Sequence, residues 1–182
     1  MDYTPGIFKL KGYAAGFPDR QVHTTLAKQL ALYVTLYSPL QMAADLPENY
    51  DAHQDAFQFI KDVATDWDDT RVVEAEPGDF ISTARKAKGT NNWFIGAITD
   101  ENSRVTNIPL TFLDKGKKYI ATIYGDAATA DWQKNPEAYT INKVLVTQAT
   151  VLKLKLANGG GAAVSIYPAT AADASKYKSY KK

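Results

Sequence analysis

Eight short segments in which apolar and polar residues alternate place the strongest constraint on the fold of this chain. Turn-forming residues such as Pro77-Gly78 and Asn158-Gly159-Gly160 separate these segments. In VLKLKL, from Val151 to Leu156, lysines alternate with apolar residues, as in a strand with one wet face. About eight short strands at this spacing predict a mainly β fold, an antiparallel β-sandwich within residues 66–170. The predicted strands are 70–75, 80–87, 93–99, 104–112, 118–124, 139–147, 150–157 and 161–167.

The first part of the chain, residues 1–65, contains an unusually apolar helix. Residues 29–44 carry no charge, and the helix is predicted to begin at Thr24 or Thr25 and to end before Pro39. A helix that is apolar on most sides is normally buried over most of its surface. Since one face of a sandwich covers only one side of a helix, we expect the chain to self-associate through it, unless the chain repacks around it.

Four further segments complete the chain. The short apolar run 39–45 predicts a buried strand or a short helix, and 53–63 predicts a second helix. Residues 66–69 begin like a calcium loop, but the expected glycine is absent and Pro77 stands at the last ligand position, so a linker is predicted. Residues 171–182 are predicted to form a basic tail that is frayed over 176–182.

Composition excludes several classes of function. The net charge of the 182 residues is +1 and cysteine is absent, which argues against nucleic acid or a membrane as partner and excludes disulfides. The only histidines, His23 and His53, lie on different predicted elements, so no metal site is predicted. Neither a signal peptide nor an apolar run of about twenty residues is visible. Because G-x-S-x-G and phosphate-loop motifs are also absent, the residues alone disclose no enzyme activity.

Longer runs of sequence carry more information than these short motifs. They include MDYTPGIF, HTTLAKQLALYVTLYSPLQMAADLPENY, WFIGAITDENSRVTNIPLTFLDKGKKYIATIYGDAATADW and LKLANGGGAAVSIYP. In order and over nearly the whole chain, these runs resemble the C-terminal part of glycoside hydrolase family 97. That family comprises α-glucosidases and α-galactosidases of glycan-using Bacteroidetes.

The resemblance implies both a fold and a missing active site. Residues 1–65 would form the end of a catalytic (β/α)8 barrel, and residues 66–170 the C-terminal β-sandwich. The catalytic carboxylates and the calcium ligands of the family lie upstream of MDYTPG, so no catalytic residue, metal ligand or cofactor is assigned to this chain. The chain alone is therefore expected to be inactive, with the missing barrel segment as its partner and a homo-oligomer possible. The parent enzymes act on α-linked glycans and are periplasmic or secreted.

Four residues are candidates for substrate binding. The resemblance places Asp2 and Tyr3 in a loop at the barrel mouth and Asp45 at a strand end, while Trp132 lies in a polar loop and could stack on a sugar. Structural alternatives are a cap or turn for Asp45 and packing for Tyr3. The alternative function is a carbohydrate-binding or protein-interaction sandwich. Coplanar, exposed Trp93 and Trp132 would favour sugar binding, although we expect Trp93 to be buried and Trp132 partly exposed.

Overall fold

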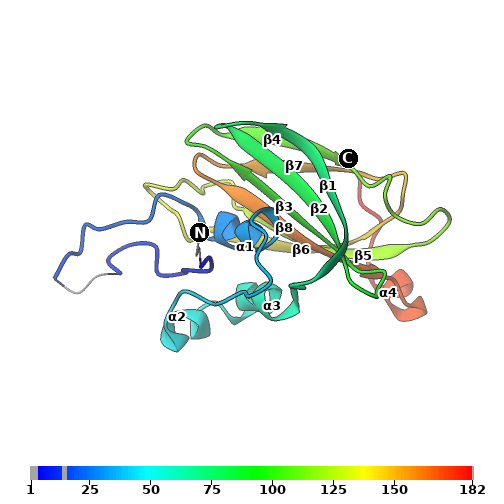
Figure 1. Ribbon diagram of the computed structural model, residues 1–182, viewed down its shortest axis with the longest axis horizontal. Coiled ribbons are helices and arrows are strands. Elements are labelled where there is room, and N and C mark those ends of the chain that lie inside the picture. The colour runs from blue at the N-terminus through cyan, green and yellow to red at the C-terminus, as the bar shows by residue number, and fades with distance from the viewer. Residues whose placement is uncertain (1–3, 14–15, 182) are drawn as a thin grey trace.

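Eight antiparallel strands form two sheets of unequal size (Figure 1). The computed structural model describes residues 4–13 and 16–181. The larger sheet has the order β1-β2-β3-β8-β5-β6, and the smaller sheet pairs β4 with β7. The predicted antiparallel sandwich and all eight of its strands are thereby confirmed. The strands are β1 (Trp67–Glu76), β2 (Phe80–Ala87), β3 (Trp93–Thr99), β4 (Arg104–Pro109), β5 (Tyr119–Asp126), β6 (Tyr139–Val146), β7 (Val151–Leu156) and β8 (Gly161–Pro168).

The core of the sandwich lies between the inner faces of the two sheets. Leu152, Leu154 and Leu156 of β7 are buried there, whereas the lysines between them are exposed. Trp93 joins this core with an exposed fraction of only 4%, which confirms its predicted burial. The alternation read from the sequence thus corresponds to the division between core and solvent.

Strand β1 begins earlier than predicted and contains two irregularities. Trp67 pairs with Ala87, and the Trp67 ring packs edge-on against Phe94, so the prediction of a linker at residues 66–69 is wrong. The acidic composition there suggested a loop, but long-range pairing decides the structure. A second register shift follows Val72 and turns Glu74 inward to accept hydrogen bonds from β2 and β4.

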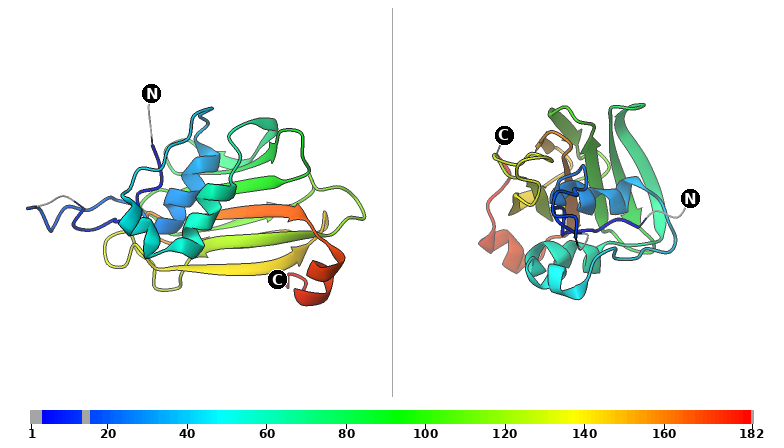
Figure 2. Two further views of the ribbon diagram at one scale, coloured as in Figure 1. Left: turned by 90° about the horizontal axis from the view of Figure 1, so that it is seen from below. Right: turned by 90° about the vertical axis from the view of Figure 1, so that its left-hand side faces the viewer.

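Helix α1 (Leu26–Thr35) lies across the outer face of the large sheet, beside α3 (Gln54–Asp62) (Figure 2). Both helices were predicted. Thr25 caps α1, since its hydroxyl accepts a hydrogen bond from Lys28 N at 3.2 Å. The close packing of α1 on β3 depends on Gly96, because a Cβ atom there would lie 2.4 Å from the carbonyl oxygen of Ala31.

Other parts of the chain cover the remaining sides of α1. Phe8 and Leu10 are buried in the same cluster as Leu30, and the side-chain oxygen of Gln29 accepts hydrogen bonds from the amides of Gly6 and Ile7. Exposed α1 side chains were our reason for expecting self-association, and that reason is wrong because Leu26 and Leu30 are fully buried within one chain. A run of exposed apolar side chains instead follows α1. It consists of Leu36, Tyr37, Leu40, Met42 and Leu46.

The segment 39–45 is neither a strand nor a helix, so both readings of that apolar run are wrong. A short helix, α2 (Pro47–Asp51), follows it. None of the helices within residues 4–13 and 16–181 is long and apolar enough to cross a membrane.

The C-terminal segment is more ordered than predicted. Residues Ala171–Lys176 form α4, whose N-terminus carries a capping box made by Thr170 and Asp173. Further on, Ser179 forms a parallel bridge with Leu145, and Lys153 N donates a 2.9 Å hydrogen bond to the hydroxyl of Tyr180. The expectation of a frayed tail after Lys176 is therefore wrong for Ser179 and Tyr180, which attach this segment to β6 and β7.

Candidate functional sites

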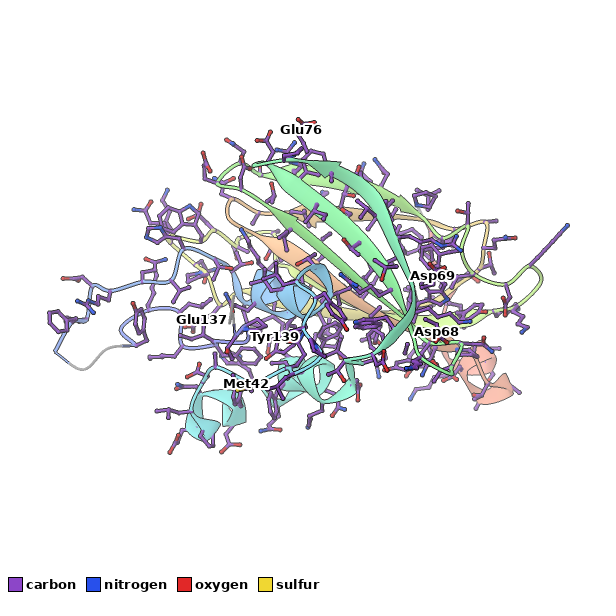
Figure 3. The ribbon with its side chains drawn as sticks, in the orientation of Figure 1. Met42, Asp68, Asp69, Glu76, Glu137 and Tyr139 are labelled. Carbon is purple, nitrogen blue, oxygen red and sulfur yellow. The ribbon has the colours of Figure 1, made fainter. Side chains whose placement is uncertain are left out.

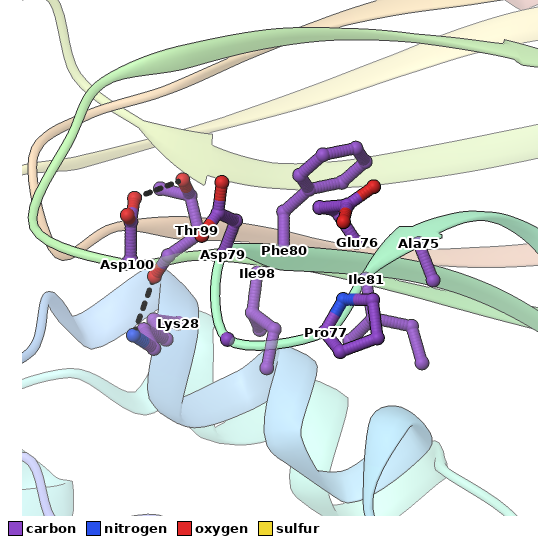
Figure 4. Close-up of a pocket in the computed structure, with 11 residues that line it drawn as sticks. Lys28, Ala75, Glu76, Pro77, Asp79, Phe80, Ile81, Ile98, Thr99 and Asp100 are labelled. Atoms are coloured by element: carbon purple, nitrogen blue, oxygen red, sulfur yellow. Dashed lines mark hydrogen bonds between the residues drawn. The ribbon is translucent and has the colours of Figure 1, made fainter.

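A hollow of about 460 Å³ lies between α1 and the turn that joins β1 to β2 (Figure 4). Ile81 and Ile98 of the strands and Pro77 of the turn project toward α1 and give the hollow an apolar wall. At its end, Lys28 Nζ donates a 2.6 Å hydrogen bond to the carbonyl of Thr99. Burial lowers the pKa of Lys28, an effect that nearby carboxylates partly offset.

The carboxylate nearest to Lys28 in this hollow is not arranged for acid–base catalysis. Asp100 accepts hydrogen bonds from the backbone and side chain of Asn102 and from the Thr99 hydroxyl. These bonds hold the pKa of Asp100 below its usual value, so it stays ionised and fully engaged. With the apolar wall beside it, the hollow is suited to receiving an apolar group.

Two adjoining hollows, of about 410 and 480 Å³, lie along the seam between β6 and β7 and share Asp126, Thr140 and Lys155. Oδ2 of Asp126 accepts hydrogen bonds from Ala157 N at 2.8 Å and Gly161 N at 2.9 Å. Burial raises the pKa of Asp126 to about 6, against the opposing effect of these bonds.

The seam does not supply the pair of free carboxylates that glycoside hydrolysis needs. Asp131, the other carboxylate lining it, accepts the amides of Gln133 and Lys134, and these bonds lower its pKa. Asp126 is committed to the turn between β7 and β8. Both carboxylates therefore hold loops in place.

The carboxylates of β1 are also dispersed rather than paired. Asp68 and Asp69 lie at one end of the strand and Glu76 at the other (Figure 3). Asp69 is 2.9 Å from the guanidinium of Arg71, and Asp68 accepts the amide of Gly89. Among residues 4–13 and 16–181, no group of three or more histidines, aspartates and glutamates lies close enough together to hold a metal ion.

Asp45 holds the N-terminal segment in place through hydrogen bonds. Its Oδ2 atom accepts hydrogen bonds from Phe8 N and Lys9 N, both at 2.7 Å, and its Oδ1 atom accepts from Leu46 N and Asn49 Nδ2. Partial burial alone would raise the pKa of Asp45, but these four donors lower it. Its carboxylate is thus already occupied by the chain itself.

Trp132 is partly exposed, as predicted, but it is not an open platform. Its side chain touches Gly159, where no Cβ could fit, and the ring of His23 lies 4.4 Å from its centroid at 46°. Trp93 lies in the core, so the two rings cannot form a shared sugar-binding surface. The other two candidate residues, Asp2 and Tyr3, lie outside the described residues.

Sequence reasoning missed Lys28, Arg85 and Asp126, the buried or half-buried charged groups beside the hollows. Each is a single charged residue within an ordinary helix or strand. Only the tertiary packing buries them, so no local pattern could have revealed them.

Comparison with known proteins identifies the chain's origin. The family model described as "Glycosyl-hydrolase 97 C-terminal, oligomerisation" matches residues 66–167. The chain belongs to glycoside hydrolase family 97. The resemblance drawn from its sequence is therefore confirmed.

Named relatives of this family 97 chain are several times longer. A retaining α-galactosidase of Bacteroides thetaiotaomicron is 35% identical over 169 residues, which is 91% of this chain and 25% of the relative. A family 97 enzyme from Pseudoalteromonas sp. strain K8, solved in complex with panose and with acarbose, is 51% identical with a TM-score of 0.88. That match covers 93% of this chain and 26% of the enzyme. A β-arabinopyranosidase, 22% identical with a TM-score of 0.72, shares the fold. The chain thus spans about a quarter of the length of these relatives.

Proposed function

We propose that this chain is the C-terminal part of a family 97 glycosidase that hydrolyses α-glucosides, and that it is inactive alone. The observation that carries the substrate class is the 51% identity, over 93% of the chain, to an enzyme solved with panose. Panose is built from glucose units, whereas the relative named as an α-galactosidase is only 35% identical. α-Galactosides are therefore the second substrate class to test.

The state of four carboxylates supports the expected inactivity. Those of Asp45, Asp100, Asp126 and Asp131 are all held by hydrogen bonds from the chain itself. A glycosidase needs one carboxylic acid and one carboxylate facing a common space. The catalytic pair and the calcium ligands then belong to the upstream part of the parent enzyme, for which we propose a periplasmic or secreted location.

Within the parent enzyme, Asp2 and Tyr3 remain our candidates for sugar contacts at the barrel mouth. Asp45 would support these sugar contacts indirectly, because its carboxylate holds the backbone amides of Phe8 and Lys9, a few residues after Tyr3. We further propose that the sandwich contributes to self-association, since the matching domain is described by its oligomerisation. Static light scattering over a concentration series of the chain measures that association.

Hydrolysis of p-nitrophenyl α-glucoside and α-galactoside by two proteins tests the proposal. The chain itself should release no nitrophenol above the uncatalysed rate. The gene product that includes the upstream barrel should hydrolyse the glucoside with the higher kcat/KM. Turnover by the chain alone that disappears on substituting one of its own carboxylates would contradict the assignment.

A further inference from the structure

On the outer face of the large sheet, the layer of helices reaches β2 only at the flank of α1 and leaves Val72 and Ala75 of β1 exposed. Helix α1 packs on β3 and β8, and Phe59 of α3 packs against Phe94 and Tyr124 (Figure 2). Next to them, β1 presents Val72 on the same face, and its side chain is 59% exposed. We call the strip between α1 and the free edge of β1 the β1–β2 trough.

Paired outward-facing residues form the floor of this trough. Ala75 lies opposite Ile81, Val72 opposite Thr83, and Thr70 opposite Arg85 in the β1–β2 ladder. The hydroxyl of Thr83 is buried and has no hydrogen-bond partner among the described residues. One part of the floor, formed by Val72, Ala75 and Ile81, is therefore apolar. The other part, formed by Thr70, Thr83 and Arg85, is polar, and Thr83 is already buried.

The two ends of the trough are hollow. The hollow of about 460 Å³ at Ile81 and Lys28 marks one end, and a hollow of about 330 Å³ at Thr35 and Arg85 marks the other. Lys28 and Thr35 are seven residues apart and so lie on one side of α1, about 10 Å apart along its axis. The two hollows have no lining residue in common, but both lie on the same side of α1.

The dimensions of the trough suit a helix. Two strand spacings amount to about 9.6 Å, and packed helices lie about 8–10 Å apart. One helix placed over β1 and β2 would thus continue the layer begun by α3 and α1. Addition of a strand to β1 is disfavoured, because the register shifts after Trp67 and Val72 interrupt its ladder.

Arg85 defines the charge that an occupant should carry. Its Nε atom donates to the carbonyl of Val34 at 2.7 Å and Nη1 to the hydroxyl of Thr70 at 3.0 Å. In the part of the chain that the structure describes, no carboxylate lies within ion-pairing distance of this half-buried guanidinium. A carboxylate arriving with the occupant would complete the site.

We propose that the β1–β2 trough receives an amphipathic helix from the part of the longer family 97 polypeptide that this chain does not contain. Its apolar side would cover Val72, Ala75 and Ile81, and an Asp or Glu near one end would pair with Arg85. This inference rests on the proposed function, under which the parent enzyme is about four times longer than the chain. The same face already binds two helices, so the new contact extends an existing interface.

Cysteine labelling tests the proposal cleanly, because the chain has no cysteine of its own. Val72→Cys is prepared in this chain and in the gene product with its upstream part, and the rate of reaction with a maleimide is measured. The longer protein should react at least tenfold more slowly. Val105→Cys is the matched control, since Val105 is 49% exposed on β4 of the other sheet and should react equally in both proteins.

Each other outcome overturns the proposal. Equal rates for Val72→Cys in both proteins would show that nothing upstream covers the trough. Protection that rises with the concentration of the short chain would assign the trough to a second copy. Ala75→Cys repeats the measurement at a second exposed position. Because labelling does not depend on catalysis, a protected but inactive enzyme would overturn the proposed function alone.

Discussion

Asp126 should make this protein less stable as the pH rises, whereas most carboxylates in folded proteins make the folded state more stable as the pH rises. Its pKa is raised from 3.8 to about 6, mainly by burial, although Thr25 and the amides of Ala157 and Gly161 oppose the increase. The folded state therefore prefers the protonated acid. The stability contributed by this preference is complete below pH 3.8 and is lost as the pH rises toward 6.

The size of the effect follows from the two pKa values. Each pKa unit corresponds to about 1.4 kcal/mol, so the change from 3.8 to about 6 amounts to about 3 kcal/mol. Asp126→Asn replaces the acid by a neutral group of the same shape, whose oxygen can still accept from Ala157 N and Gly161 N. The variant should match the wild type at pH 4 and exceed its stability by up to about 3 kcal/mol at pH 7.

Urea unfolding at intervals from pH 4 to pH 7 measures this difference. Subtracting the wild type removes the titration of all other groups, provided that they do not interact with the substituted residue. Asp131→Asn is the control, because hydrogen bonds from Lys134 and Gln133 lower the pKa of that exposed carboxyl. Its stability difference should have the opposite sign and should disappear in acid. A difference for Asp126→Asn that does not change between pH 4 and pH 7 would refute the reasoning.

Three further predictions concern packing. Gly96→Ala should lower the free energy of unfolding in urea by about 1–3 kcal/mol, because the new methyl group meets the backbone of α1. Gly125→Ala is the control, since the space around Gly125 is open, and it should change that free energy by less than about 0.5 kcal/mol. Equal losses in the two variants would contradict this prediction. Iodide should quench a variant that retains only Trp132 more strongly than one that retains only Trp93, and similar quenching would count against the burial described. Tyr180→Phe removes the hydroxyl that fastens the C-terminal segment to β7 and should cost about 1 kcal/mol; an unchanged unfolding midpoint would show that the bond contributes nothing.

The sandwich could be predicted from sequence because its strands each have two unlike faces. In β7 the leucines face the core and the lysines face water, so the alternation of residue types along the sequence predicts which side chains are buried. The start of β1 lacks this pattern. Asp66, Asp68 and Asp69 surround Trp67, whose position in the strand depends on contacts with Ala87 and Phe94, both distant in sequence. Pairing between residues that are distant in sequence produces no recognisable pattern within residues 66–69 themselves.

The burial of α1 could be predicted only in part. The apolar composition of this helix correctly indicated burial on most sides, but the residues that cover it are determined by the tertiary fold. Gln29 is an example, since a polar residue on this helix is buried because it accepts the amides of Gly6 and Ile7. The expectation that a second copy covers α1 is wrong, because Phe8 and Leu10 of the N-terminal segment, which was read as a loop, pack with this helix.

The candidate site residues were the least predictable part. Asp45 was assigned to substrate or to a turn, and its four hydrogen bonds show that it organises the loop itself. The raised pKa of Asp126 is caused by burial between loops that are far apart in the chain, which a single sequence does not reveal. Residue type therefore suggested chemistry, but only packing decided which groups were free to act.

The matched family domain and the physical packing unit of this chain have different boundaries. The family model spans residues 66–167, which contain the eight strands except for the last residue of β8. Gly96 and Gly161, however, lie under α1, and a Cβ atom at either position would collide with that helix. Glycine in a strand weakens the strand, so its presence at these two positions is explained by the close approach of a helix from outside the matched span. The large sheet thus binds helices on its outer face, and the β1–β2 trough is the part of that face where Val72 and Ala75 stay exposed beside α1.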